Sequence, residues 1–262
     1  MNLETIKEEP VSDVRSTPIL FVHGMSHAAW CWAEHFVLYF AQHGYVSHAL
    51  SLRGHGSSEG RKRLRWTPLA EYVSDVAQVV DQMERPPVLV GHSMGGMIVQ
   101  KYLESNGAPA AVLLASAPPQ GVVRATLRVA LRHPLVFMKA NLTMSMLPML
   151  STPQLAQEAL FSADMPEHKV RSYFTRLQDE SFRAYLDMMG LSLPRPERVK
   201  TPILVLGAAD DRLISPSNVE ATARAYRTKA EVLPGIAHDM MLEAGWQAVA
   251  DRVLVWLDEL GL

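Results

Sequence analysis

The chain has 262 residues, of which 48% are hydrophobic, so it can bury one large core within a single domain. Its formal net charge of −2 gives no reason to expect a nucleic acid as partner. No apolar run reaches the roughly eighteen residues that a membrane-spanning helix needs, which leaves only weak association with a membrane surface open.

The N-terminus and the cysteine content indicate the cellular compartment of the protein. Residues 1–10 lack the basic and then apolar layout of a signal peptide. The chain has one cysteine, Cys31, which excludes an internal disulfide and fits a reducing environment. Since Cys31 lies between Trp30 and Trp32, we expect a packed thiol rather than a nucleophile. These features predict a cytoplasmic protein.

Strand-like and helix-like stretches alternate along the chain, which predicts an α/β fold: a mostly parallel sheet of about six strands with helices on both faces. Residues 3–15 can add at most one edge strand. The expected strands are 19–22, 45–50, 87–90, 110–116, 202–207 and 230–233. The expected helices are about 29–42, 68–84, 94–105, 216–226 and 243–259.

The first expected strand, residues 19–22, ends in His23-Gly24-Met25. A His-Gly pair at such a point usually shapes a loop whose backbone N–H groups stabilise a negatively charged oxygen. We therefore expect the amides of Met25 and Met94 to form an oxyanion hole, with Gly24 beside the bound substrate. The methionine side chains would keep that pocket apolar and adaptable.

His23 and His27 form a His-x-x-x-His pair, a spacing found in some metal sites. Such a pair needs a helix to bring both rings to one side and a third ligand to complete the site. Here the pair lies in a strand-to-helix loop beside a glycine. We therefore predict no metal site, and the chain shows no sign of a cofactor.

The run Arg61-Lys62-Arg63-Leu64-Arg65 places four cations in five positions, on the side of the sheet where ligands enter. Such a run can attract a phosphate, a carboxylate or an anionic lipid surface. It can also be a solvated loop without a ligand. The second interpretation is favoured because it is the more common one.

The most informative motif is Gly91-His92-Ser93-Met94-Gly95, which follows the apolar run 87–90 and precedes a helix-like stretch. A strand, Gly-x-Ser-x-Gly and a helix in this order are typical of a nucleophile elbow. The turn is so tight that neighbouring β-carbons would clash, which explains the glycines. We expect Ser93 to be the nucleophile, while His92 points away from the reacting carbon.

A serine hydroxyl needs a base and a group that orients the base, and in this kind of fold the acid precedes the histidine. His238 follows the last expected strand and is the only histidine after His168, so we expect it to be the base. Asp210 and Asp211 follow the preceding strand. The sequence around Asp211 is typical of the stretch that holds a catalytic aspartate, so Asp211 is favoured over Asp210.

The alternation breaks between Pro118 and Val199, over a stretch too long for a structureless loop. Seven of the chain's fourteen methionines fall there. They either fill the core beneath helices or form a deformable lining for an acyl chain. The second hypothesis selects three methionines of an apolar segment as substrate-binding residues: Met144, Met146 and Met149.

These motifs, together with Arg53-Gly54-His55-Gly56-Ser57-Ser58, resemble the α/β-hydrolase superfamily. The bacterial esterase, lysophospholipase-like or monoacylglycerol-lipase-like branch is the most similar. The resemblance runs from about Pro18 to the C-terminus and implies a core of residues 1–118 and 199–262 with a helical cap, or lid, inserted at 119–198. In one departure, Ser51 stands where such proteins often carry aspartate.

The resemblance and the motifs together predict a cofactor-independent serine hydrolase that cleaves small carboxylic esters with an apolar acyl group through Ser93, Asp211 and His238. The same scaffold also supports C–C bond hydrolases, lyases and perhydrolases. A non-catalytic ligand-binding member is the alternative from another class. Serine at position 93 argues against dehalogenases and epoxide hydrolases, which place an aspartate there.

Overall fold

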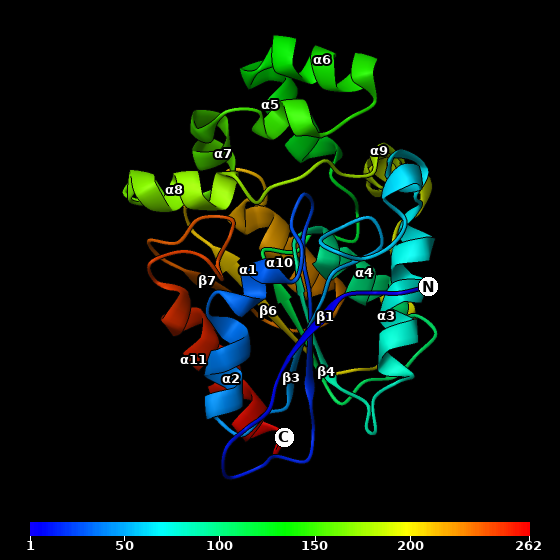
Figure 1. Cartoon of the computed structure of the whole chain (residues 1–262), viewed down its shortest axis with the longest axis vertical. Coiled ribbons are helices and arrows are strands. Elements are labelled where there is room, and N and C mark those ends of the chain that lie inside the picture. The colour runs from blue at the N-terminus through cyan, green and yellow to red at the C-terminus, as the bar shows by residue number, and fades with distance from the viewer.

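A seven-stranded sheet lies at the centre of the computed structural model, which describes residues 1–262 (Figure 1). The strand order is β1-β3-β2-β4-β5-β6-β7, and only β1 runs antiparallel to its neighbour. The predicted parallel sheet of six strands with one N-terminal edge strand is therefore confirmed. The strands are β1 Thr5–Glu8, β2 Ile19–Val22, β3 Ser47–Leu50, β4 Val88–His92, β5 Ala111–Leu114, β6 Ile203–Ala208 and β7 Ala230–Leu233.

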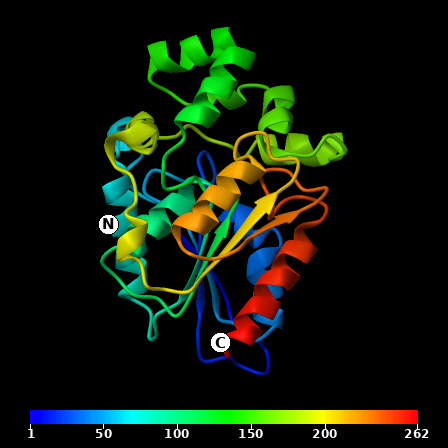
Figure 2. The ribbon, with the colours of Figure 1, turned by 180° about the vertical axis from the view of Figure 1, so that it is seen from behind.

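Helices cover both faces of the sheet because successive residues of each strand point to opposite sides. Ile19 and Phe21 of β2 belong to one core, which packs under α1 (Trp30–Ala33), α2 (Phe36–Gln42) and α11 (Trp246–Glu259). Leu20 and Val22 belong to the other core. That core packs under α3 (Leu69–Val80), α4 (Met94–Tyr102) and α10 (Pro216–Ala225), as the two opposite views show (Figures 1 and 2).

Two local features differ from the sequence-based prediction. The single helix expected over 29–42 is split into α1 and α2 at His35, whose φ of −143° is not helical. The imidazole of His35 stacks on Trp246 of α11, with ring centroids 4.6 Å apart. The basic run expected as a loop forms a short 3-10 helix, η1 (Arg61–Trp66).

Ser51, the departure from the family pattern, connects the N-terminal edge strand to the core. Its hydroxyl accepts a hydrogen bond from the Ala29 N–H at 2.9 Å and bonds to the Glu4 carboxylate just before β1. The hydrogen bond between Ser51 and Glu4 therefore holds the N-terminal segment against the loops that follow β2 and β3.

Most of residues 119–198 form a helical layer at one end of the molecule, beyond the carboxyl ends of the parallel strands, and the last of them run back beside α4 to the start of β6 (Figures 1 and 2). None of the helices of the structure combines the length and the hydropathy that crossing a bilayer would require. The α-helices of this layer are α5 Val123–Arg132, α6 Pro134–Thr143, α7 Pro153–Leu160, α8 Glu167–Phe174 and α9 Phe182–Leu186. The layer also contains η2 Leu147–Leu150 and η3 Asp187–Leu191, whereas η4 Pro196–Arg198 lies on the way back to β6.

Candidate functional site

Ser93 lies in the turn between β4 and α4, with φ 53° and ψ −118°, a conformation that costs energy for any residue with a side chain. Close packing holds it there. A β-carbon on Gly95 would lie 2.3 Å from the carbonyl oxygen of Val22, and one on Gly91 would lie 2.6 Å from the carbonyl of Gly95. The Ser93 N–H donates to the carbonyl of Leu114 at 3.1 Å, so β2 and β5 both support the turn.

The side chains of Ser93, His238 and Asp211 form one chain of hydrogen bonds. His238 Nε2 lies 2.9 Å from Ser93 Oγ, and His238 Nδ1 lies 2.8 Å from Asp211 Oδ2. The second carboxylate oxygen of Asp211 accepts from the backbone N–H groups of Leu213 at 2.7 Å and Ile214 at 2.8 Å. The acid is therefore fixed by its own loop and has one oxygen left for the imidazole.

The electrostatics of the two histidines beside Ser93 differ. Burial disfavours the charged form of His238, but the charge and the hydrogen bond of Asp211 outweigh it, so the pKa of His238 is raised above its usual value. Burial and the neighbouring His238 lower the pKa of His92 to about 3, which keeps it neutral. His92 Nε2 donates to the backbone carbonyl of His238 at 2.9 Å and so supports the loop that carries the base.

Two unused backbone donors lie next to the serine. No hydrogen bond within the protein uses the amide N–H of Met25 or of Met94, and both residues line the cavity that contains Ser93. Gly24 lies against the nucleophile, where a β-carbon would be 2.9 Å from Cβ of Ser93. Both N–H groups are therefore without a protein partner in residues that line the cavity of Ser93.

A second buried histidine–aspartate pair lies beside the first, and the sequence reasoning missed it. His27 Nε2 donates to Asp239 Oδ2 at 3.0 Å, and His27 Nδ1 donates to the Met25 carbonyl at 2.8 Å. Burial opposes both charges, but the mutual attraction raises the pKa of His27 and lowers that of Asp239. The pair thus connects the loop of Met25 to the residue that follows His238. The only sequence signal for this pair is the aspartate that directly follows the predicted base, His238.

The residues considered as metal ligands are engaged with the protein. His23 Nδ1 donates to the Gly24 carbonyl at 2.7 Å, and its Nε2 accepts from the Leu52 N–H at 3.1 Å, so its ring braces two loops. His92, His238 and Asp239 place ligand atoms within 4.8 Å of one another. Each of these three residues has a partner described above, while His92 Nδ1 and Asp239 Oδ1 are buried without one, and the set lies beside Ser93.

A cavity of about 780 Å³ contains Ser93 and extends between the sheet and the helical layer. Hydrophobic residues make up 21 of the 36 that line it, and α5 and α6 contribute many of them. Met146 and Met149 line the cavity, but Met144 does not. Met144 ends α6 in a left-handed conformation, φ 48° and ψ 47°, where the chain turns before η2. The basic run of η1 also lies outside this cavity.

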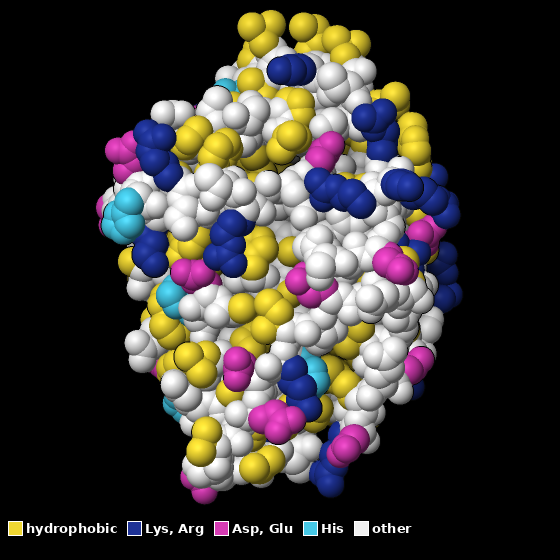
Figure 3. Space-filling model, in the orientation of Figure 1, with side chains coloured by type: hydrophobic (Ala, Val, Ile, Leu, Met, Phe, Trp, Pro, Cys, Tyr) yellow, Lys and Arg dark blue, Asp and Glu magenta, His cyan; other side chains and the backbone are white.

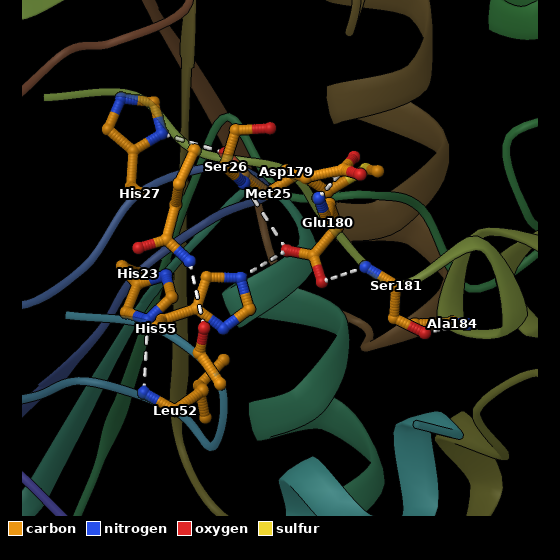
Figure 4. Close-up of polar contacts among 12 residues, drawn as sticks. His23, Met25, Ser26, His27, Leu52, His55, Asp179, Glu180, Ser181 and Ala184 are labelled. Carbon is orange, nitrogen blue, oxygen red and sulfur yellow. Dashed lines mark hydrogen bonds and ion pairs between the residues drawn. The ribbon is translucent and has the colours of Figure 1, made fainter. Parts of the chain in front are cut away.

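Glu180, fully buried between α8 and α9, is a further residue that sequence reasoning missed (Figure 4). Its carboxylate accepts from Ser26 N–H at 3.3 Å, Ser181 N–H at 2.6 Å and Tyr72 Oη at 2.7 Å, and His55 Nε2 lies 3.0 Å away. Burial raises the pKa of Glu180, but His55 and the hydrogen-bond donors lower it by more than burial raises it. The pKa of Glu180 is therefore below its usual value. The segment between α8 and α9 is thereby joined to the loops after β2 and β3.

Comparison with known proteins places these features in a family. A family model described as "Alpha/beta hydrolase family" matches residues 19–252. A monoacylglycerol lipase of Mycolicibacterium smegmatis is 27% identical over 266 residues, which cover 95% of this chain and 90% of that protein. A non-heme chloroperoxidase of Burkholderia pyrrocinia is 35% identical over 112 residues, 39% of this chain and 38% of that protein.

A solved structure shows the same architecture. The monoacylglycerol lipase of Paleococcus ferrophilus superposes with a TM-score of 0.73 at 21% identity, and the match covers 99% of this chain and 100% of that one. At this identity the similarity establishes the arrangement of strands and helices alone.

The buried carboxylate of Glu180 gives a prediction about stability. Glu180→Gln replaces one acceptor by an NH2 group that faces donors, so the free energy of unfolding at pH 7 should fall by about 2–3 kcal/mol. Because the folded pKa of Glu180 is lowered, its ionisation stabilises the fold above the unfolded pKa. That contribution is lost as the pH falls through the folded pKa, so the difference between the proteins should shrink under acid conditions. Urea unfolding at several pH values measures both effects.

The exposed Glu84 supplies the matched control, because Glu84→Gln makes the same chemical change outside any hydrogen bond. It should leave the unfolding midpoint within experimental error. Equal midpoints for the two variants would contradict the role assigned to the Glu180 carboxylate.

Proposed function

We propose that this chain, which belongs to the alpha/beta hydrolase family, is a serine hydrolase that cleaves carboxylic esters with an apolar acyl group. One observation carries the proposal. Ser93 Oγ, the His238 imidazole and the Asp211 carboxylate are joined at 2.9 Å and 2.8 Å, beside two free backbone N–H groups and at the wall of a largely apolar cavity. This arrangement supports acyl transfer.

In the first half of the reaction, Ser93 Oγ attacks the carbonyl carbon of the ester while His238 Nε2 takes the hydroxyl proton. Asp211 holds the imidazole with Nδ1–H toward itself and stabilises the positive charge that forms. The carbonyl oxygen becomes an oxyanion that the amides of Met25 and Met94 stabilise, a contribution of roughly 3 kcal/mol per donor. The tetrahedral adduct then expels the alcohol, which receives the proton from His238, and leaves Ser93 acylated.

In the second half, His238 takes a proton from a water molecule, and the resulting hydroxide adds to the acyl carbon of the ester on Ser93. The same two amides stabilise the second oxyanion. The bond between the acyl carbon and Ser93 Oγ then breaks, Ser93 Oγ receives the proton back from His238, and the carboxylic acid leaves. The enzyme returns to its starting state without a change in oxidation state.

The substrate class follows from the cavity. Residues 119–198 act as a cap in this proposal, because α5, α6 and η2 supply apolar lining that includes Met146 and Met149. Flexible thioether side chains adapt to apolar groups of varied shape. A cavity of about 780 Å³ is large enough for an acyl chain of medium length. The similarity to a monoacylglycerol lipase over 95% of this chain supports the same class.

A second candidate is a perhydrolase, favoured by the partial similarity to a non-heme chloroperoxidase. It uses the same acyl-enzyme on Ser93, but hydrogen peroxide in place of water attacks the acyl carbon, and a peracid leaves. Ester turnover in water with no gain in peracid on addition of hydrogen peroxide would favour the hydrolase.

Ser93→Ala should lower kcat toward p-nitrophenyl esters by about a millionfold, because neither partner of the triad can act without the nucleophile. A fluorophosphonate probe should label Ser93 in the unaltered protein, and mass spectrometry should locate it there. Ser74→Ala, which removes an exposed hydroxyl from α3, should keep full activity and full labelling. Undiminished ester turnover in Ser93→Ala would end the proposal.

Asp211→Asn should lower kcat by about ten-thousandfold, because the amide favours the wrong tautomer of His238. Asp210→Asn should have little effect, since Asp210 is exposed and has no contact with the imidazole. In the unaltered protein kcat/KM should rise as neutral His238 forms, with a midpoint above about 6.5, because its pKa is raised. The residual activity of Asp211→Asn should show a midpoint at lower pH. A crippled Asp210→Asn with a normal Asp211→Asn would reassign the acid.

Acyl-chain length should matter to the rate. Each buried methylene contributes about 0.8 kcal/mol, so kcat/KM for medium acyl chains should exceed that for acetate by more than about tenfold. Met146→Gln with Met149→Gln should remove much of that advantage. Met144→Gln is the matched control from the same segment, outside the cavity lining, and should preserve the advantage. A flat rate from acetyl to decanoyl esters would indicate a compact substrate.

A further inference from the structure

The outer surface of the helical layer carries an apolar patch, called here the cap crest. It lies at the end of the molecule farthest from the C-terminus, where hydrophobic atoms gather at the top of the space-filling view (Figure 3), over α5 and α6 in Figure 1. Between 43% and 76% of the surface of each member is exposed. The members are Val123, Leu127 and Leu131 of α5, Leu135, Met138 and Leu142 of α6, and Leu147 of η2; of these, Leu131 also borders the cavity of Ser93.

The composition of α6 makes this exposure unusual. A helix at the surface of a protein in water normally turns a polar face outward. In α6, Val136, Phe137 and Ala140 line the cavity of Ser93, whereas Leu135 and Leu142, two turns apart, are 74% and 76% exposed. The helix is therefore apolar toward the cavity and apolar toward the outside. Ordinary packing accounts for the inner face only.

The unpaired charges on the two helices of the cap crest, Arg124 of α5 and Lys139 of α6, are both positive. No aspartate or glutamate occurs between Glu104 and Glu158, although the whole chain has a net charge of −2. Arg132 pairs with Glu158 of α7, and the Asp179 carboxylate accepts from the Leu147 N–H at 3.0 Å, but Arg124 and Lys139 form no ion pair. The cations of this acid-free stretch are Arg124, Arg128, Arg132 and Lys139.

This sign of charge decides between two occupants of the patch. A second copy of the chain, docked crest to crest by a two-fold axis, would bring the unpaired Arg124 and Lys139 of both copies toward one another. An anionic lipid surface would instead accept the leucines among its acyl chains and attract the cations to its head groups.

We infer that the cap crest docks this protein on the surface of an anionic bilayer or lipid aggregate, with the outer faces of α5 and α6 lying in the interface. No segment crosses the bilayer in this mode, in keeping with the absence of a helix long and apolar enough to do so. The inner faces of the same two helices line the cavity, so docking brings the cavity wall to the lipid. Docking itself requires no ester turnover.

Flotation of the full chain with vesicles tests the inference. The protein should float with vesicles of phosphatidylcholine mixed with phosphatidylglycerol, and much less with phosphatidylcholine alone. Raising the salt from about 0.01 M to about 1 M should weaken the binding, because it shortens the Debye length from about 30 Å to about 3 Å. Ser93→Ala should bind equally well, so a failure of the proposed hydrolase activity leaves this test intact.

Leu135→Ser with Leu142→Ser, both outside the cavity lining, should reduce vesicle affinity by at least about tenfold while hydrolysis of a dissolved ester stays unchanged. Arg124→Gln with Lys139→Gln should remove the preference for anionic vesicles. The matched control is Leu38→Ser with Val255→Ser, which removes two half-exposed apolar side chains from α2 and α11 and should bind as the unaltered protein does.

Two results would overturn the inference. One is equal flotation of the crest variant and the control variant, which would show that the exposed leucines of α6 do not contact lipid. The other is a dimer in sedimentation that the crest substitutions dissociate, without vesicle binding by the unaltered protein, which would assign the patch to a second copy.

Discussion

The turn after β4 lies against the end of β2 with no room for a side chain between them, and the geometry of the site depends on that contact. Gly95 meets the carbonyl oxygens of Val22 and His23, so the turn cannot relax away from its strained conformation at Ser93 without opening the sheet. The same proximity brings the loop of Met25 beside the turn of Ser93 and Met94, and both methionines line the cavity. Tertiary packing thus holds a backbone that the local sequence alone would not adopt.

Buried charges connect the loops around this turn. Transfer of a carboxylate from water into a protein interior is unfavourable unless hydrogen bonds and an opposite charge replace its solvent. Asp211, Asp239 and Glu180 each have a histidine nitrogen within 3.0 Å, and Asp211 and Glu180 also accept from backbone N–H groups, whereas Oδ1 of Asp239 has no partner. Each carboxylate connects residues that are separated in the sequence. Removal of one partner would leave the other charge buried and alone, which makes the arrangement of the loops cooperative rather than a sum of separate contacts.

The strands and the turn at Ser93 could be predicted because their signals are local. A fully buried strand such as β2 is a continuous apolar run, and the glycines around Ser93 report the crowding of one turn. Glu180 could not be predicted, since Ser26 and His55, which it contacts, lie 154 and 125 residues away along the chain. Met144 resembles Met146 in sequence context, and only the backbone turn at the end of α6 separates them.

Arg128 gives the outermost helices a direct connection to the acid of the site. Its guanidinium donates from α5 to the backbone carbonyl of Leu213 at 2.8 Å, and the N–H of Leu213 donates to Asp211 Oδ1 at 2.7 Å. The position of α5 and the orientation of the Asp211 carboxylate are therefore energetically coupled through Leu213. A partner bound to the outer surface that favours one position of α5 therefore also favours one orientation of this carboxylate. By thermodynamic reciprocity, a ligand that orders the carboxylate changes the affinity for that partner by the same factor.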